Sequence, residues 1–403
     1  MNTISTCEVC DTPLTETTLN LGMHPLCDDL KPIGFDGEQQ EYPIEILHCP
    51  TCLTAHQRYQ VPKTELFPVT YHYRSRFTAD VLAGMQDFVK SCSATLGSLQ
   101  HKTVLDIGCN DGTLLSYFAG AGAGKTIGVD PTDAIKDASE VHKTYQGYFD
   151  TSLAQTIRQH HGPIDLITFT NVFAHIEDLK GLLKALKMLC HDETVIAIEN
   201  HYLGEVLARN QFDTFYHEHP RTYCLTSFSY IAKSLGMEVM AFSFPKRYGG
   251  NIRVMLSKQP AADPYALTQH MEKEKAYGLA FQSMSENISR WIQVKTKEIQ
   301  TLNSSYGPLR AKAFPGRAAI LVKLLKLTAE NISVVYEKPG SMKVGHYLPG
   351  TKIPIQSDEN FDSNDDTPII NLAWHISDEI HRYMRGNHFE GLIIDILSEV
   401  DFQ

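Results

Sequence analysis

The sequence predicts an α/β protein in which a Rossmann-like domain stands between a small metal-binding module and a second α/β domain. Short apolar runs alternate with helical stretches from Thr103 onward, a pattern typical of a mostly parallel sheet covered on both faces. Ahead of them, four cysteines form two pairs, Cys7 with Cys10 and Cys49 with Cys52, each separated by two residues. The chain has 403 residues, so two or three domains are expected.

Composition and charge exclude two classes of protein. The formal net charge is −11, and a nucleic-acid-binding protein needs a basic face to displace counterions. The sequence contains no run of about 18 apolar residues, so we expect no membrane-spanning helix. The segment Met1–Thr6 is polar and lacks the features of a signal peptide, which favours a cytoplasmic protein. The sequence carries no signal for an oligomeric state.

The cysteine pairs predict a structural zinc site within residues 1–62. This segment is expected to be loop-rich, with too little apolar periodicity for a core of its own, which suits a module held by a metal. Two intervening residues let both sulfurs of a pair face one ion, and two pairs complete a tetrahedral thiolate site. The predicted ligands are therefore Cys7, Cys10, Cys49 and Cys52. Coincidental spacing is the alternative, and the nearby histidines are further candidate ligands: His24, His48 and His56.

The remaining boundaries follow from hydrophobic periodicity. Residues 63–100 are predicted to form a linker and a helix, Ala79–Leu96. Residues 101–262 form the Rossmann-like domain, with a helix at Gly112–Gly120 and strands at Thr103–Ile107, Thr126–Val129, Asp165–Thr170, Thr194–Ile198, Glu238–Phe244 and Asn251–Leu256. Apolar spacings of three and four predict a long connecting helix over 263–305. Residues 306–403 form the last domain, with a helix at Ala318–Leu327, a solvated loop at Asp358–Asp366, and strands at Ile332–Tyr336, Ile369–Ala373 and Leu392–Ile396.

The loop after the first strand of the Rossmann-like domain predicts a nucleotide-type cofactor. It reads Gly108-Cys109-Asn110-Asp111-Gly112, and its glycines allow the backbone to turn tightly and approach a ligand. It differs from the Gly-x-Gly-x-x-Gly of dinucleotide-binding loops. The second strand ends at Asp130, where a carboxylate can accept both ribose hydroxyls. Two carboxylates favour S-adenosylmethionine over a dinucleotide or a purely structural turn, with these predicted contacts: Asp106, Gly108, Asn110, Asp111, Gly112, Asp130 and Pro131.

Two further segments carry candidate site residues. Asn171 follows the third strand, where it can line a cofactor or cap the next helix. Tyr216-His217-Glu218-His219 is the densest group of proton-transfer side chains in the chain. Histidine suits a general base, Glu218 can orient an imidazole and Tyr216 can donate to a developing oxyanion. A polar surface turn is the alternative, and a metal site is disfavoured because the two histidines are only two residues apart.

Together these motifs resemble the sugar C-methyltransferases of deoxysugar biosynthesis, which act on nucleotide-linked ketosugars. The resemblance covers nearly the whole chain: the cysteine pairs, Leu105–Leu115, Asn171–His175, Phe215–His219, Tyr248–Val254 and Leu348–Ile355. It implies a class I methyltransferase domain, an N-terminal zinc-binding module and a C-terminal α/β domain that closes the active site.

The resemblance also implies residue roles. His219 would be the base that forms an enolate beside the ketone, at C-3 of a 4-keto-deoxysugar, with Glu218 and Tyr216 as the other catalytic residues. The linker and helix over residues 63–100 would contribute to the substrate site. Tyr73, or else Tyr71, and Lys352 would contact the sugar nucleotide, while Asn171 would join the cofactor site. The alternatives are an O- or N-methyltransferase acting on a nucleotide sugar and a sugar-nucleotide-binding protein without activity.

Three segments of the last domain depart from the family pattern. Ala313–Arg317 replaces a Tyr-Gly-Ala run, Trp374-His375 replaces a Trp-Asn pair, and Tyr336–Pro339 replaces an Asp-x-Asn-Pro segment. These departures bear on the sugar and its nucleotide rather than on methyl transfer.

Overall fold

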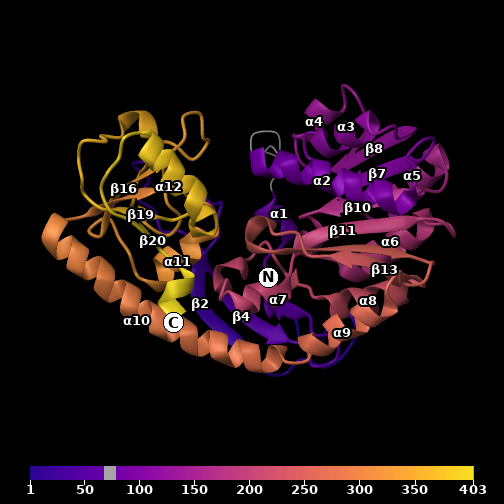
Figure 1. Ribbon diagram of the computed structural model, residues 1–403, viewed down its shortest axis with the longest axis horizontal. Helices are drawn as coiled ribbons and strands as arrows, with labels where there is room; N and C mark the ends of the chain where they lie inside the picture. Colours follow the sequence, from indigo (N-terminus) through magenta and orange to yellow (C-terminus); the bar gives the residue numbers. More distant parts are fainter. Residues whose placement is uncertain (68–78, 403) are drawn as a thin grey trace.

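A computed structural model describes residues 1–67 and 79–402. Two α/β domains stand side by side, and the N-terminal module lies between them (Figure 1). The helices α9 (Pro264–Glu274) and α10 (Tyr277–Tyr306) run along one edge of the molecule from one domain to the other. None of the helices in the described ranges is both long and apolar enough to cross a membrane.

The Rossmann-like domain is built on a seven-stranded sheet with the order β13-β14-β11-β10-β7-β8-β9. All its strands run parallel except β14, which is antiparallel to both neighbours. The strands are β7 (Thr103–Ile107), β8 (Lys125–Asp130), β9 (Lys143–Gln146), β10 (Leu166–Thr170), β11 (Val195–His201), β13 (Glu238–Ser243) and β14 (Asn251–Ser257).

Alternate side chains of the strands face two helical layers. Val104 and Leu166 pack in one apolar cluster with α2 (Ala79–Leu96) and α3 (Thr113–Gly120). Leu105 and Ile167 pack on the other side, with the helices α5 (Thr151–His161), α6 (Leu179–Leu189) and α8 (Leu225–Leu235). Two short helices, α4 (Ile135–Ala138) and α7 (Leu203–Ala208), lie in the loops. This is the Rossmann-like arrangement that the sequence predicts. The apolar pattern of the sequence does not predict the edge strand β9, because none of its four residues is buried.

The N-terminal module shares its core with the rest of the protein. Its antiparallel sheet, β12-β5-β4-β2, contains a strand from the Rossmann-like domain, β12 (Arg221–Thr222). The other strands are β2 (Leu19–Pro25), β4 (Glu41–His48) and β5 (Ala55–Gln57). Apolar residues of β2 and β4 pack in one cluster with α10 and with α11 (Ala318–Leu324). The module therefore lacks a large core of its own, as expected, but it holds more regular strand than expected. The pair β1 (Asn2–Thr3) and β6 (Tyr59–Gln60) closes it, and α1 (Lys63–Leu66) follows.

The C-terminal domain contains a five-stranded parallel sheet with the order β18-β16-β15-β19-β20. Its elements are β15 (Leu309–Lys312), β16 (Ile332–Glu337), β18 (Ile355–Ser357), β19 (Ile369–Asn371), β20 (Ile393–Asp395) and α12 (Ser377–Gly386). A short pair, β17 (His346–Tyr347) with β3 (Lys31–Pro32), joins this domain to the N-terminal module.

Two expectations for the C-terminal half need correction. The helical stretch over 263–305 is two helices, because α9 ends at Glu274 and α10 begins at Tyr277. The Asp358–Asp366 segment is not simply solvated, because Asp358 accepts a hydrogen bond from the buried Lys312 ammonium at 2.6 Å. The main chain of this segment also accepts hydrogen bonds from the Arg310 guanidinium.

Candidate active site

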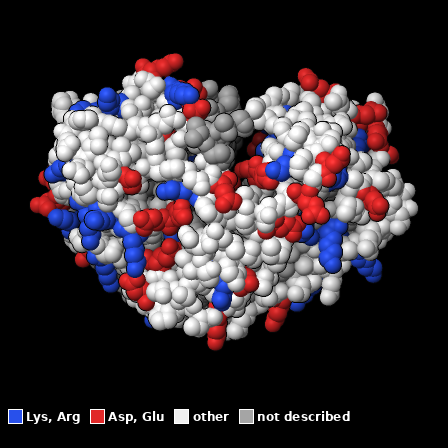
Figure 2. Space-filling view, turned by 180° about the vertical axis from the view of Figure 1, so that it is seen from behind, with Lys and Arg blue, Asp and Glu red and all other residues white. Residues whose placement is uncertain are grey.

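A cavity of about 560 Å³ lies where the domains meet. The surface is hollowed between the two lobes, with acidic side chains along one edge of the hollow (Figure 2). The Rossmann-like domain lines the cavity with the loops at the carboxyl ends of its strands, which is where ligands bind in such sheets. The N-terminal module adds Cys27 and Asp28, the linker adds Lys63 and Phe67, and the C-terminal domain adds Pro315, Gly316, Arg317 and His375.

The predicted cofactor loop forms one end of this cavity, and close packing fixes its path. Gly108 has a φ of 77°, and a Cβ there would lie 2.5 Å from Cγ2 of Val172. Gly128 on β8 lies under the loop, where a Cβ would be 2.6 Å from Sγ of Cys109. The backbone can therefore approach a ligand at Gly108, Cys109 and Asn110, all of which line the cavity.

Asp106 and Asp130 lie at the ends of neighbouring parallel strands and line the same end of the cavity. Burial raises the pKa of Asp106 to about 7. A hydrogen bond from Thr168 Oγ1 at 2.7 Å partly offsets this rise, and the charge of Asp130 adds to it. Asp130 accepts hydrogen bonds from the backbone N–H of Asn110 and from Thr132. The two carboxylates are therefore held in place beside the loop, where their charge and hydrogen-bonding capacity would suit an ammonium and ribose hydroxyls.

The remaining predicted cofactor residues fall into two groups. Asn110, Pro131 and Asn171 line the cavity. Asn171 has a φ of 55°, and its side-chain oxygen accepts a hydrogen bond from Asn251 Nδ2 at 3.3 Å. It does not cap α6, because Asp178 is the N-terminal cap of that helix. Asp111 and Gly112, the last two residues of the loop, do not line the cavity. The Asp111 carboxylate accepts hydrogen bonds from the backbone and hydroxyl of Thr113 at the start of α3, so it shapes the loop.

The Tyr216–His219 segment forms the other end of the cavity and is buried rather than a surface turn. The Nδ1 atom of His219 lies 3.0 Å from the main-chain oxygen of Thr214, so this nitrogen donates and Nε2 is the proton acceptor. The His219 ring lies 4.3 Å from the Tyr216 ring, 4.7 Å from the His175 ring and 5.2 Å from the His201 ring, centroid to centroid. Burial, and then the neighbouring histidines, hold the pKa of His219 well below its ordinary value, so the ring is neutral.

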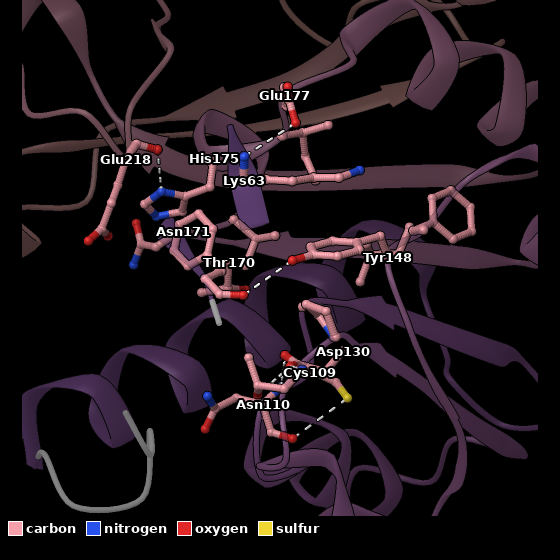
Figure 3. Close-up of a pocket in the computed structure, with 18 of the residues that line it drawn as sticks. Lys63, Cys109, Asn110, Asp130, Tyr148, Thr170, Asn171, His175, Glu177 and Glu218 are labelled. Carbon is pink, nitrogen blue, oxygen red and sulfur yellow. Dashed lines mark hydrogen bonds between the residues drawn. The ribbon is translucent and has the colours of Figure 1, made fainter. Parts of the chain in front are cut away.

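Glu218 does not orient an imidazole through its carboxyl group. Its main-chain oxygen, rather than its carboxylate, faces Nδ1 of His175 at 2.7 Å (Figure 3). Burial, and then the neighbouring Asp28, raise the pKa of the Glu218 carboxyl group well above its ordinary value, and Thr214 takes the orienting role for His219. His217 faces away from the cavity, with Nε2 3.2 Å from the Tyr42 carbonyl.

The C-terminal domain brings two of its three unusual segments to the cavity. Arg317 makes a buried bidentate ion pair with Asp213, at 2.8 and 2.6 Å, and Asp213 also accepts a hydrogen bond from Trp374 Nε1. His375 lines the cavity beside this pair. In the third segment, Glu337 accepts a hydrogen bond from the Phe314 backbone at 2.6 Å and so supports the Pro315–Arg317 loop.

Of the three predicted substrate residues, Lys352 is the one that the structure describes. The Lys352 ammonium donates to the main-chain oxygen of Phe35 in the N-terminal module, and Lys352 does not line the cavity. Tyr71 and Tyr73 lie outside the described residues.

Several lining residues had no place in the sequence prediction. His201 ends β11 at the same sheet edge as Asn171, so the rule that selected Asn171 could have found it. Burial, and then the charge of Arg317, lower the pKa of His201 to about 3. Cys27, Asp28, Lys63 and Tyr148 carry no local signal, because only the packing of the domains brings them to the cavity.

The four predicted metal ligands come together in the N-terminal module. Their Sγ atoms lie within 4.8 Å of one another, with Cys7 and Cys52 3.4 Å apart and Cys10 and Cys49 3.5 Å apart. Thiolates about 2.3 Å from a tetrahedral zinc ion would be about 3.8 Å apart, so the cluster fits zinc. Thr12 and Thr54 hydroxyls lie 3.2 and 3.1 Å from sulfurs of Cys10 and Cys52. Of the three candidate histidines only His56 reaches a sulfur, 3.3 Å from Cys7, and it acts as a hydrogen-bond partner because four thiolates complete the site.

Comparison with known proteins agrees with this division of the chain. Three domain families match in order: "Putative zinc binding domain" over residues 7–67, "Methyltransferase domain" over 74–241 and "C-methyltransferase C-terminal domain" over 246–393. The C-methyltransferase NovU of Streptomyces niveus is 25% identical over 390 residues, covering 94% of this chain and 91% of that protein. A ubiquinone biosynthesis O-methyltransferase of Aromatoleum aromaticum is 32% identical over 95 residues, covering 23% of this chain and 40% of that protein.

Among solved structures, the chain is similar to the magnesium protoporphyrin IX methyltransferase of Synechocystis PCC 6803 with bound SAH. That match has 19% identity, covers 45% of this chain and 86% of the other, and has a TM-score of 0.35.

The fold, the cofactor loop and the matched methyltransferase domain define an S-adenosylmethionine-dependent methyltransferase. The three domain families and the match along nearly the full length place the chain more narrowly. It carries a zinc-binding domain, a methyltransferase domain and a C-methyltransferase C-terminal domain in that order, and it is similar to a C-methyltransferase along nearly its whole length. Its cofactors are S-adenosylmethionine and a structural zinc ion, for which the paired carboxylates and the four sulfurs provide fitting ligands.

Proposed function

We propose that the chain methylates C-3, the carbon beside the ketone, of a nucleotide-linked 4-keto-deoxysugar, with His219 as the base. The observation that carries this proposal is the setting of His219. Its Nδ1 is fixed by the Thr214 carbonyl, and its Nε2 is the acceptor in a cavity that reaches from the cofactor loop to the C-terminal domain.

The chemistry follows from the substrate class. A carbon beside a ketone can lose a proton because the resulting enolate spreads its charge onto oxygen. His219 takes that proton on Nε2. Burial raises the pKa of Tyr216 well above its ordinary value, so its phenol stays protonated and can donate to the enolate oxygen. When bound, S-adenosylmethionine supplies an electrophilic methyl group, and the cavity must hold it about 3 Å from the carbon.

The choice of a sugar nucleotide rests on the Tyr216–His219 and Leu348–Ile355 segments, which resemble those of the sugar C-methyltransferases. The carbon acceptor is supported by the C-methyltransferase NovU, to which the chain is similar along nearly its whole length. The short match to an O-methyltransferase keeps an oxygen or nitrogen acceptor as the second candidate.

Mass spectrometry in heavy water tests the proposal. A nucleotide-linked 4-keto-6-deoxysugar is incubated with the protein, with and without S-adenosylmethionine. We expect deuterium uptake beside the ketone without the cofactor and a carbon-bound methyl group with it. Methyl transfer to oxygen or nitrogen across a panel of sugar nucleotides would replace this proposal with the second candidate.

The His219→Ala variant tests the base. We expect proton exchange and methyl transfer to fall about 10²- to 10⁴-fold, the usual contribution of a general base, with unchanged S-adenosylmethionine affinity. His217→Ala is the matched control, because His217 lies two residues away, is equally buried and faces the Tyr42 carbonyl. Equal losses in the two variants would indicate a folding defect, and full activity of His219→Ala would remove this residue from the mechanism.

A further inference from the structure

The side chain of Arg221 joins the zinc-binding module to the wall of the cavity. Arg221 lies on β12, which pairs with β5 of the module, and it is completely buried. Its Nη1 donates a hydrogen bond at 2.5 Å to the carboxylate of Glu8, which stands between Cys7 and Cys10. Its Nε donates to the Tyr223 hydroxyl at 2.9 Å. The guanidinium is therefore fixed by the first pair of cysteines on one side and by the methyltransferase domain on the other.

The other N–H groups of Arg221 hold two main-chain oxygens of the cavity wall. Nη2 donates to the carbonyl of Ile176, and both Nη atoms lie 3.3 Å from the carbonyl oxygen of Glu177. Ile176 and Glu177 line the cavity and connect the 3₁₀ turn Phe173–His175 with α6. Among the described residues, no backbone N–H donates to either carbonyl. Arg221 therefore supplies the hydrogen bonds that this irregular stretch of backbone requires.

The stretch that Arg221 holds follows directly on His175, which lies against the base. The His175 ring is 4.7 Å from the His219 ring, centroid to centroid. The Nδ1 atom of His175 donates to the main-chain oxygen of Glu218 at 2.7 Å. A shift of the main chain after His175 would therefore move this ring against His219. Through the guanidinium, the first pair of cysteines is connected to the position of the base.

The other contacts between the module and this stretch are weaker. The Glu177 carboxylate accepts hydrogen bonds from Asn2 Nδ2 and from the Lys63 backbone N–H, each at 3.4 Å. Lys180, in the first turn of α6, pairs with Asp11 at 2.6 Å, but these side chains are 68% and 69% exposed. Exposed ion pairs contribute little because water screens them. The guanidinium is therefore the buried connection between the module and the cavity wall.

We propose that Glu8 and Arg221 are positioning residues for methyl transfer, which hold His175 against the base through the main chain that follows it. The inference rests on the proposed function for the identity of that base, His219. Geometry rather than charge is what the contact requires. A planar guanidinium can bind a carboxylate and two carbonyls at fixed angles, whereas a lysine ammonium is a compact charge on a flexible stem. Arg221→Lys therefore keeps the charge and removes the positioning.

Hydrogen–deuterium exchange of main-chain amides, followed by mass spectrometry, tests the positioning without any substrate. In Arg221→Lys and Glu8→Gln, residues 173–182 should exchange about 10-fold faster than in wild type, the effect of losing one hydrogen bond to a charged group. Asp11→Asn is the matched control, because it removes a carboxylate of the same cysteine loop that makes only the exposed pair. Zinc content should be equal in all variants, since none of them changes a sulfur ligand. Wild-type exchange of this stretch in both variants would overturn the inference.

Deuterium uptake by the ketosugar tests the consequence for the reaction. In Arg221→Lys the maximal rate should fall about 10²-fold, the usual cost of misplacing a reacting group by about 1 Å. Affinity for S-adenosylmethionine should stay near that of wild type, because Asp106 and Asp130 have hydrogen-bond donors of their own. Arg310→Lys is the matched control: Arg310 is buried and also holds main-chain carbonyls, but it does not line the cavity. It should lower the melting temperature without slowing deuterium uptake.

The two hypotheses fail differently. Faster amide exchange in Arg221→Lys, with no deuterium uptake by any ketosugar in wild type, would refute the proposed reaction alone. Deuterium uptake at the same rate in wild type and Arg221→Lys would refute the positioning role alone. Equal losses of rate in Arg221→Lys and Arg310→Lys would assign the effect to stability and also refute that role. If Arg221→Lys does not fold, Glu8→Gln, which keeps the guanidinium and a neutral acceptor, decides both measurements.

Discussion

Burial sets the protonation state of the side chains in the cavity. It disfavours the charged form of every group, so it lowers the pKa of an imidazole and raises that of a carboxyl group without a cationic partner. His219 and Glu218 are neighbours in sequence and both buried, and burial shifts their pKa values in opposite directions. One physical cause therefore acts oppositely on two residue types.

Asp106 should link cofactor binding to proton release. Its pKa of about 7, raised by burial, means that it is largely protonated at about pH 6, whereas an ammonium of the cofactor requires the ionised form. Affinity should rise with pH up to about 7 and level off above it. Calorimetry at about pH 6 in buffers of different ionisation heat should give roughly one proton released per cofactor, and none in Asp106→Asn.

The same shift has a consequence for stability. The pKa of Asp106 rises from its ordinary value of 3.8 to about 7 on folding, so the folded protein binds more protons between these values. The contribution of Asp106 to stability therefore falls as the pH rises from about 4 to about 7. In the calorimetry of cofactor binding, equal proton release by wild type and Asp106→Asn would assign the coupling of proton release to cofactor binding to another group.

At the scale of elements, the strand, loop and helix around Gly108 form one rigid unit. Gly108 and Gly112 both have a φ of 77°, a conformation that L-residues with a side chain avoid. Val172, from the loop after β10, packs against Gly108, and Ala138 of α4 packs against Gly112. The loop is therefore held from two neighbouring elements before a ligand arrives.

Gly108→Ala should destabilise the protein and weaken cofactor binding. The left-handed backbone costs about 1–2 kcal/mol for a residue with a Cβ, and the Cβ must also displace Val172. Gly97→Ala is the matched control, with a φ of 75° and no atom within 4 Å of the added Cβ. Denaturant unfolding should show a loss in both variants and a larger loss in Gly108→Ala. Only Gly108→Ala should lower cofactor affinity, and unchanged affinity would mean that the loop moves freely.

At the scale of the whole molecule, the zinc-binding module is part of the active site rather than an appendage. Its sheet shares a core with α10 and α11, and Cys27 and Asp28 line the cavity. Glu8, between the first pair of cysteines, accepts a hydrogen bond from the buried Arg221 of the methyltransferase domain. The zinc-binding module therefore forms part of one wall of the cavity and is tied to the methyltransferase domain.

Removing zinc should abolish methyl transfer while leaving cofactor binding. We expect one zinc per chain by elemental analysis, and a melting temperature several degrees lower after chelation, because metal binding contributes folding energy. Cofactor affinity should persist, since the cofactor loop lies on β7 and β8, away from the module. Cys49→Ser should reproduce the effect, and Cys190→Ser, outside the cluster, should keep its zinc. Full activity of the zinc-free chain would refute this role.

Local pattern in the sequence determined the α/β class, the zinc ligands, the cofactor loop and the Tyr216–His219 segment, because each depends on residues close together in the chain. Local pattern did not predict the polar edge strand β9, the break between α9 and α10 or the Asp358 ion pair, because these features depend on the tertiary environment. Only the tertiary structure brought Asp28 and Glu218 to one cavity, Arg317 to Asp213 and His201 to His219. These partners come from different elements, most of them from different domains, and no spacing rule connects them. Their contacts and pKa values exist only once the three domains have buried them together.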